Sequence, residues 1–284
     1  GDYHERVHVP GEDELGALAQ SFNQMAATLE QTEQRRLDLI GNVAHELRTP
    51  LTSIRGIMEG LVDGVLPAEP STYMRVQREV SRLQRLVNDL QELSRAEAGQ
   101  IPIEPCQVAP AELVHAAADR LRPQFEDKGV ELHIEVPAHL PQVWADSDRI
   151  IQVLINLLGN ALHYTPAGGR VSIQLSVISD QSSVISNQQG DQLITDHCLL
   201  FTVQDTGIGI PPEHLPHIFE RFYRVDKSLS RAGGGSGIGL TVARHLVEAH
   251  GGRIWAESAG AGQGSTFAFT LPSPQMNTPS KRKT

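Results

Sequence analysis

Apolar residues recur at alternating steps of three and four between residues 37 and 61. This spacing places them on one side of a helix, and a run of more than three heptads is typical of a coiled coil or helical bundle. The residues are Leu37, Ile40, Ala44, Leu47, Leu51, Ile54, Met58 and Leu61. We therefore predict a helix that continues to about Val62 and bends just past residue 45, because Pro50 removes a backbone donor.

A second helix is predicted between Ser71, a plausible N-cap, and Gly99, a residue that ends helices. Its apolar positions are Val76, Val80, Leu83, Val87 and Leu90. Two antiparallel helices with one apolar seam each cannot close a core alone. We therefore expect residues 33–98 to form a homodimer, in which two chains build an antiparallel four-helix bundle. The same helix carries a basic stripe, either a solvated face or a docking surface for an acidic partner, at Arg75, Arg78, Arg82 and Arg85.

The pattern changes on either side of this hairpin. Before it, an amphipathic helix is predicted from Leu15, Leu18, Phe22, Met25 and Leu29. After it, strands alternate with helices, which is typical of a mixed α/β domain. Helices are expected at 110–128, 148–163 and 237–250, and strands at 130–136, 143–145, 170–178, 198–204, 253–257 and 265–271. A polar stretch at 179–196 is expected to be a hairpin loop, and the tail 273–284 to be disordered.

Composition narrows the function classes. The chain has 284 residues, which leaves room for two domains or for one domain plus a long helical segment. Its 39 % hydrophobic and 20 % charged residues are ordinary for a soluble globular protein. A net charge of −10 argues against nucleic-acid binding. Two cysteines without metal spacing, Cys106 and Cys198, favour a reducing compartment. No apolar run reaches the length of a membrane span, and the absence of an initial Met suggests an excised fragment.

The sequence His45-Glu-Leu-Arg-Thr-Pro-Leu51 carries the first candidate chemistry. His45 falls one position past the apolar seam and is therefore expected to face water. A neutral imidazole is a good nucleophile, and the adjacent Glu46 can take its proton. Thr49 lies one turn further along on the same face. An isolated exposed histidine is most often a bystander, but here an acid, a hydroxyl and a helix bend accompany it.

Four clusters in the second half indicate a nucleotide site. Asn156 and Asn160 emerge on one face of a helix, and their neutral oxygens suit a hard cation such as Mg²⁺. Asp205 follows a strand and can accept a hydrogen bond from an exocyclic amine. Glycines at 233–239 open a helix whose N-terminus can approach phosphates. Between these glycines and Asp205, the aromatic stretch 219–227 is typical of an anchored, mobile lid.

The order of these motifs resembles that of sensor histidine kinases of two-component systems. His45–Leu51 is similar to their phospho-accepting motif. The later clusters resemble the asparagine box, glycine boxes and phenylalanine box of their ATPase domain, and Gly262–Phe267 resembles its last glycine box. Residues 7–25 resemble the end of a HAMP linker, a module that normally follows a membrane-spanning helix.

The resemblance implies a role for each matched residue. His45 would accept the phosphoryl group, Glu46 would act as general base, and Thr49 would serve the reverse reaction. Asn160, with Asn156, would hold Mg²⁺. ATP would contact Tyr164, Asp205, Gly207, Gly209, Arg224, Gly235, Gly237, Gly239 and Thr266. One departure from the family pattern is His163, where many relatives carry Lys or Arg near the phosphates.

We therefore expect a partial HAMP linker (1–32), a dimerisation and phosphotransfer hairpin (33–100), and an α/β-sandwich ATP-binding domain (101–272). The predicted activity is that of a protein-histidine kinase, which phosphorylates His45 and then an aspartate of a response regulator. The protein would be the cytoplasmic part of a membrane sensor, attached through a missing upstream segment, and itself soluble. Two alternatives are a chaperone- or mismatch-repair-type ATPase, which leaves residues 41–51 unexplained, and a nucleotide-binding scaffold without turnover.

Overall fold

The computed structural model describes residue 7 and residues 14–178, 198–225 and 236–272. The predicted loop at 179–196 and the tail at 273–284 lie outside these ranges. The chain divides into two compact units, Gly1–Val87 and Asn88–Thr284. Within the described ranges, no helix combines the length and apolarity that a membrane span requires.

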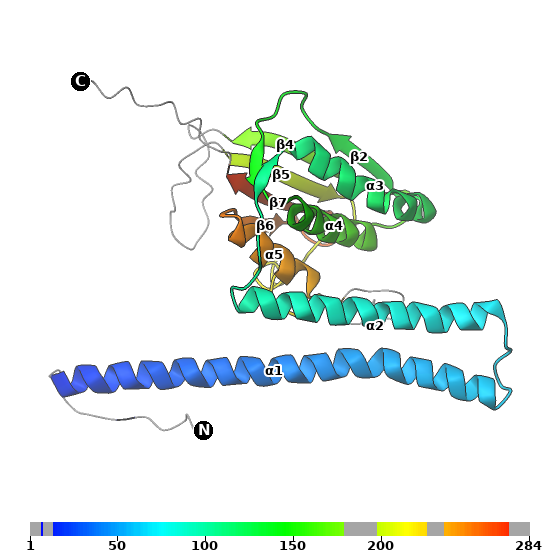
Figure 1. Cartoon of the computed structure of the whole chain (residues 1–284), viewed down its shortest axis with the longest axis horizontal. Coiled ribbons are helices and arrows are strands. Elements are labelled where there is room, and N and C mark those ends of the chain that lie inside the picture. Colours follow the sequence, from blue (N-terminus) through cyan, green and yellow to red (C-terminus); the bar gives the residue numbers. More distant parts are fainter. Residues whose placement is uncertain (1–6, 8–13, 179–197, 226–235, 273–284) are drawn as a thin grey trace. The chain divides into compact units, whose positions relative to one another are not determined.

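The first unit is built on a helical hairpin, whose second helix continues past Val87 into the second unit. Helix α1 spans Glu14–Val62 and contains Pro50, and helix α2 spans Pro70–Glu97. Figure 1 shows α1 as one uninterrupted helix with a shallow bend in the half that holds Pro50. The connecting turn closes tightly, since Leu66 N donates to the Gly60 carbonyl at 2.8 Å. The predicted helical segment is therefore confirmed, and α1 runs without a break across the predicted boundary between residues 32 and 33.

The start of α2 differs from the prediction. The helix begins at Pro70, so Ser71 lies inside it and is not the N-cap. Proline suits a first helical position because its missing N–H has no partner there in any case. The Thr72 hydroxyl instead reaches back to the Pro67 carbonyl at 2.9 Å. At the other end Gly99 adopts φ 63°, and Gln100 N donates to the Arg95 carbonyl at 2.9 Å, which closes the helix as predicted.

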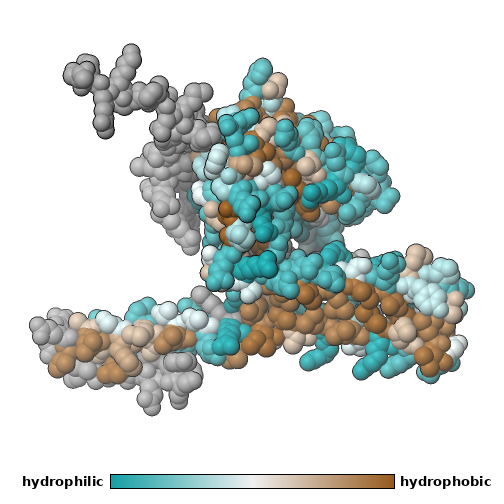
Figure 2. Space-filling view, viewed as in Figure 1, coloured by the Kyte–Doolittle hydropathy of each residue, from teal (hydrophilic) through white to brown (hydrophobic). Residues whose placement is uncertain are grey.

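The predicted apolar seam of α1 divides into residues that are half-buried within the single chain and residues that are exposed. Its members Leu47, Ile54 and Leu61 are half-buried, and Ile57, between them, is buried. Other members remain exposed in the single chain, as do several apolar residues of α2. They are Leu37, Ile40, Leu51, Met58, Tyr73, Met74, Val80 and Val87. Figure 2 shows hydrophobic residues gathered along the hairpin, so this unit carries an uncovered apolar band.

A five-stranded mixed sheet forms the second unit. The strands are β2 (Glu131–Glu135), β4 (Arg170–Ile178), β5 (Cys198–Asp205), β6 (Ile254–Glu257) and β7 (Ser265–Pro272). Their order is β2-β4-β5-β7-β6, in which only β2 and β4 pair in parallel. A small additional ladder joins β1 (Cys106–Val108) to β3 (Val143–Ala145). The sequence did not predict β1, because a three-residue strand carries no alternation of its own and forms only through its partner.

Three helices cover one face of this sheet, as Figure 1 shows: α3 (Pro110–Lys128), α4 (Ser147–Tyr164) and α5 (Gly239–Ala249). Phe201 and Phe269, which are partners across β5 and β7, stack in the core with ring centroids 4.5 Å apart. On the opposite face Gln174, Ser176 and Gln204 are exposed. The predicted fold class, a helical hairpin followed by a layer of helices on a mixed sheet, is confirmed.

Candidate functional site

Helix α4 presents two contrasting faces. Asp146 caps its N-terminus by accepting from Arg149 N at 3.2 Å. Its apolar side is almost fully buried against the sheet and the other helices, at Ile150, Val153, Leu154, Leu157, Leu158 and Ala161. Asn156 and Asn160 lie one turn apart on the other side and are half-buried. Burial of the apolar side therefore fixes the direction of the asparagines.

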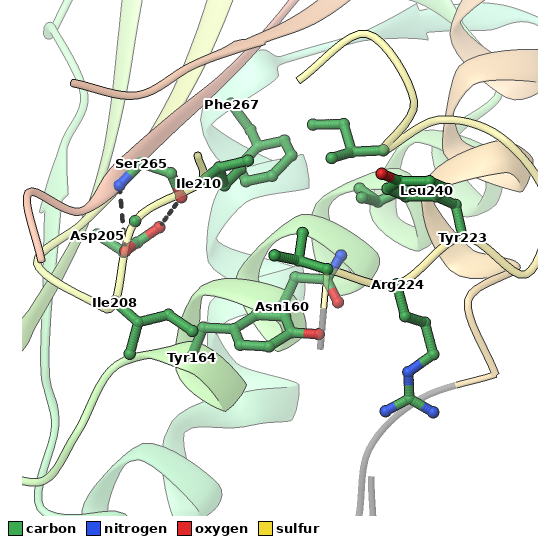
Figure 3. A pocket seen from close by; sticks show the side chains of 13 residues that line it. Asn160, Tyr164, Asp205, Ile208, Ile210, Tyr223, Arg224, Leu240, Ser265 and Phe267 are labelled. Atoms are coloured by element: carbon green, nitrogen blue, oxygen red, sulfur yellow. Dashed lines mark hydrogen bonds between the residues drawn. The ribbon is translucent and has the colours of Figure 1, made fainter. Parts of the chain in front are cut away.

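A pocket opens beside Asn160. Its empty volume is about 600 Å³, a figure that includes space open to solvent. Figure 3 shows side chains from α4, β7 and the segments after β5 converging on it. The lining residues are Asn160, Tyr164, Asp205, Ile208, Gly209, Ile210, Ile218, Tyr223, Arg224, Val225, Leu240, Ser265 and Phe267. Apolar side chains thus surround a small number of polar groups, an arrangement that suits a planar base with a charged tail.

Asp205 is held rigidly at the end of β5, where it is only 5 % exposed. Its Oδ1 accepts from Gly207 N at 2.8 Å and from Ser265 N at 3.3 Å. Its Oδ2 accepts from the Ser265 hydroxyl. A buried carboxylate with this many donors has a fixed orientation, and it can still accept one more hydrogen bond from a ligand because each oxygen has two lone pairs.

Glycines let two loops pack backbone against backbone behind the pocket. Gly209 has φ 72°, and a Cβ there would lie 2.0 Å from the Gly260 carbonyl oxygen. Gly264 has φ 70°, and a Cβ there would lie 2.0 Å from the Asp205 carbonyl oxygen. Gly264 N donates to the Gly207 carbonyl at 3.1 Å. These glycines are therefore required for the close approach of the chain to itself.

The other wall comes from the aromatic stretch and the start of α5. Tyr223 lines the pocket, and its hydroxyl lies 2.6 Å from His214 Nδ1. Phe222 has a left-handed backbone, φ 59°, and its N–H donates to the Gly237 carbonyl at 2.9 Å. This hydrogen bond joins residues on either side of segment 226–235, which includes Gly235 and lies outside the described residues. Strained backbone of this kind is common at binding sites.

Positive charge gathers at the end of α4. Lys128 Nζ donates to the carbonyls of Leu162 and His163 at 2.6 and 2.8 Å, and burial lowers the pKa of this lysine. Burial also lowers the pKa of His163, and the nearby Lys128 and Arg224 cations lower it further. His163 packs edge-on against Tyr164, with ring centroids 4.7 Å apart. An anionic ligand bound beside Lys128 and Arg224 would offset their charge and so weaken their effect on the pKa of His163.

Among the described residues, five predicted ligand residues do not line the pocket: Asn156, Gly207, Gly237, Gly239 and Thr266. Asn156 does not line the pocket; its Nδ2 donates to the Gly239 carbonyl at 3.1 Å and braces α5 against α4. Thr266 also lies outside the lining, because side chains alternate along β7 and its neighbours Ser265 and Phe267 face the pocket. Ser265, Phe267 and Tyr223 also line the pocket, although they were not predicted from the sequence as ligand residues. Strand parity could have identified the first two, since both lie within the last glycine motif.

The candidate phospho-acceptor lies in the first unit. His45 is exposed on α1, as predicted from its position beside the apolar seam. Thr49 Oγ1 donates to the His45 carbonyl at 3.3 Å, on the face where the helix approaches Pro50. Glu46 Oε2 lies 3.7 Å from Arg82 Nη2 of α2. The predicted basic stripe is therefore incomplete: Arg75, Arg78 and Arg85 are exposed, whereas Arg82 pairs inside the hairpin.

Comparison with protein families gives three matches in chain order. Residues 1–31 match the HAMP domain, and residues 35–99 match the His Kinase A (phospho-acceptor) domain. Residues 145–275 match the histidine kinase-, DNA gyrase B- and HSP90-like ATPase family. The second match covers His45, the residue that a chaperone- or mismatch-repair-type ATPase would leave without a role.

Individual relatives agree with these matches. The chain is 39 % identical over 272 residues to the signal transduction histidine-protein kinase BaeS of Escherichia coli, covering 96 % of this chain and 54 % of BaeS. It is 37 % identical over 250 residues to the sensor histidine kinase WalK of Bacillus subtilis, covering 86 % of this chain and 38 % of WalK. The chain thus spans about half the length or less of these curated relatives.

A solved structure shows the same architecture. The histidine kinase AdeS of Acinetobacter baumannii superposes with a TM-score of 0.64 at 25 % identity, over 81 % of this chain and 98 % of the AdeS chain. The three domain matches therefore occur in the order that the motifs suggested, and relatives align over nearly the whole chain. The chain belongs to the sensor histidine kinases of two-component systems.

Proposed function

We propose that this chain binds ATP in the pocket beside Asn160, transfers the γ-phosphoryl group to His45, and passes it on to an aspartate of a response regulator. The observation that carries the proposal is the convergence of Asn160, Asp205 and Arg224, from three separate motifs, on one pocket. An exposed histidine in a phospho-acceptor domain supplies the recipient. A scaffold without turnover would need neither this acceptor nor its adjacent acid.

The pocket residues suit the parts of ATP. Asp205 would accept from the exocyclic amine of adenine, and its fixed carboxylate would select for that amine. Tyr164, Ile208 and Phe267 would enclose the base, and Arg224 would meet the phosphates. Anions bind well at a helix N-terminus, so the start of α5 at Gly239 would add its dipole, with Gly237 and Gly235 preceding it.

The donor set also fits Mg²⁺. Within the described residues, no three His, Cys, Asp or Glu side chains cluster to form an all-protein metal site. Mg²⁺ keeps several waters and commonly uses few protein oxygens together with substrate phosphates. We propose the amide oxygen of Asn160 as its ligand, with Asn156 contributing from one turn earlier. The ion would neutralise phosphate charge, the main requirement of phosphoryl transfer.

At His45, phosphorylation of an imidazole nitrogen requires that this nitrogen lose its proton to a nearby base. The bond from the γ-phosphorus to the ADP oxygen would break as a bond to an imidazole nitrogen forms, and Glu46 would accept the proton that this nitrogen loses. Thr49, one turn on, would position a water for removal of the phosphoryl group from the regulator's aspartate. A second copy of the chain would cover the apolar band of the hairpin, and the HAMP segment would deliver the input from a membrane sensor region.

Incubation with ATP labelled at the γ-phosphate tests the proposal. The chain should acquire label that is lost in acid and kept in alkali, as a phosphoramidate is. His45→Gln should bind ATP but incorporate no label, whereas Asn160→Asp should lose both, because an added negative charge faces the phosphates. Acid-stable label, or full labelling of His45→Gln, would overturn the assignment.

A further inference from the structure

The side chains of His45 and Glu46 diverge. His45 is exposed, whereas the Glu46 side chain is 23 % exposed and reaches across the hairpin to Arg82. Successive residues on a helix do not face each other, so Glu46 must change its orientation to take a proton from His45. In the described conformation its carboxylate is engaged elsewhere.

The pair with Arg82 is distinct from an ordinary surface pair. Arg82 Nη2 and Glu46 Oε2 lie 3.7 Å apart, and both side chains are about three-quarters covered, at 24 % and 23 % exposure. Arg55 and Glu59 lie the same 3.7 Å apart on α1, but their side chains are 73 % and 66 % exposed. Solvent screens the second pair far more than the first, so only the first is expected to restrain its carboxylate.

A second acid, Glu79, lies on the same helix as Arg82. Glu79 precedes it by three residues on α2, a spacing at which side chains are neighbours. Glu79 Oε2 is buried, and among the described residues it has no hydrogen-bond partner. A buried acceptor without a donor is costly, so movement of Arg82 toward Glu79 would offset the loss of its contact with Glu46.

We propose that Arg82 is a positioning residue that holds Glu46 away from His45 in the resting hairpin and releases it by turning to Glu79. This inference rests on the proposed function, in which Glu46 accepts the imidazole proton as the P–N bond forms. In the resting arrangement the Glu46 carboxylate is not at hand to accept the proton, which is left to water, a weaker base, and transfer is slow. When Arg82 pairs with Glu79, the Glu46 carboxylate is free to turn toward the imidazole.

Autophosphorylation rates of single variants test the proposal. Arg82→Met should raise kcat at saturating ATP by roughly threefold to fivefold, the effect of losing a partly exposed ion pair. KM for ATP should not change, since the pocket is untouched. Arg82→Lys should stay near wild type, because a cation remains. Glu79→Gln should lower kcat, because Arg82 then has no competing carboxylate. Arg55→Met, which breaks the exposed pair at equal distance, is the matched control and should have no effect.

A double-mutant cycle isolates the contact. In a Glu46→Gln background, Arg82→Met should produce no further rise, because its effect acts through the carboxylate. If that background is too slow to follow, the opposite signs of Arg82→Met and Glu79→Gln decide. Unchanged or slower labelling in Arg82→Met, or a rise that persists without Glu46, overturns the proposal. Failure of the proposed function would look different, since the wild-type chain would then acquire no label that depends on His45.

Discussion

Gly237 shows how one residue can control the pocket. Its φ is 74°, and an added Cβ would lie 2.9 Å from the backbone of Phe222, which is itself left-handed. Phe222 N donates to the Gly237 carbonyl, so the two residues fix each other's position. Phe222 lies two residues before Arg224, and Gly237 lies two residues before the start of α5. Any side chain at residue 237 would have to displace backbone rather than a flexible side chain.

We therefore predict that Gly237→Ala weakens ATP binding by about tenfold, since an L residue at positive φ costs roughly 1–2 kcal/mol. Gly159→Ala is the control, because a Cβ at this helical glycine would meet nothing within 4 Å. That variant should bind ATP normally and unfold at a slightly higher temperature. Titration with a fluorescent nucleotide measures the affinities. Equal affinities in the two variants would refute the role of the Phe222–Gly237 hydrogen bond.

A second residue, His163, should make the ATPase domain sensitive to acid. Its pKa in the folded chain lies below the ordinary value of 6.5, because of burial and then of Lys128 and Arg224. The unfolded chain therefore binds the proton more readily, and the stability that neutral His163 contributes is present above pH 6.5 and is lost as pH falls through its folded pKa. His163→Gln lacks this group.

Thermal unfolding without nucleotide, followed by tryptophan fluorescence, measures the effect, since Trp144 and Trp255 both lie in the second unit. Between pH 7.5 and pH 5.5 the midpoint should fall less in His163→Gln than in the wild-type chain. His139→Gln, at an exposed loop position, should follow the wild-type chain. The same decline in all three proteins would show that His163 does not contribute.

At the scale of elements, the hairpin is the part that a single chain leaves incomplete. Three of the eight predicted α1 seam residues are half-buried within the chain, and the other five stay exposed, as do several apolar residues of α2. A contiguous apolar band on a helical pair is typical of an interface. A second copy of the same hairpin would cover it and complete four helices.

Leu51→Asp should therefore weaken the dimer by at least about tenfold, since each interface buries the residue twice and a buried leucine contributes roughly 1.5–3 kcal/mol. Leu51 is 54 % exposed in the single chain. Val65→Asp, in the turn before α2 and 78 % exposed, is the control and should leave the dimer intact. Sedimentation equilibrium distinguishes the two. A monomeric wild-type chain, or an unaffected Leu51→Asp, would exclude this face as the interface.

At the scale of the whole molecule, the exposed arginines of α2 remain a prediction for regulator docking. If Arg75, Arg78 and Arg85 meet an acidic face of the regulator, reversing two of their charges should slow phosphotransfer and leave autophosphorylation intact. The difference should shrink as salt rises, because exposed charges are screened over a Debye length of about 8 Å at physiological ionic strength. Unchanged transfer at low salt would make these residues an ordinary solvated face.

The sequence by itself determined the parts of this protein that depend on local pattern. Strand β4 and helix α3 have the predicted bounds, because alternation and helical spacing are read from neighbouring residues. The exposed setting of His45 followed from its offset from the seam. The order of the motifs sufficed to indicate the family, since each motif is a short contiguous stretch. Its residue types indicate its chemistry even when the residues that it contacts in the fold are unknown.

Only the tertiary structure decided which residues meet across long separations. Ser265 reaches Asp205 because β5 and β7 pair, and strand parity turns Thr266 away from the pocket. Asn156 braces Gly239, a contact over 83 positions of the chain. Arg82 is not part of an exposed basic stripe, because the hairpin brings Glu46 opposite it and the two side chains pair. Periodicity along one element fixes the side of that element on which a residue lies, but packing between elements fixes what the residue contacts.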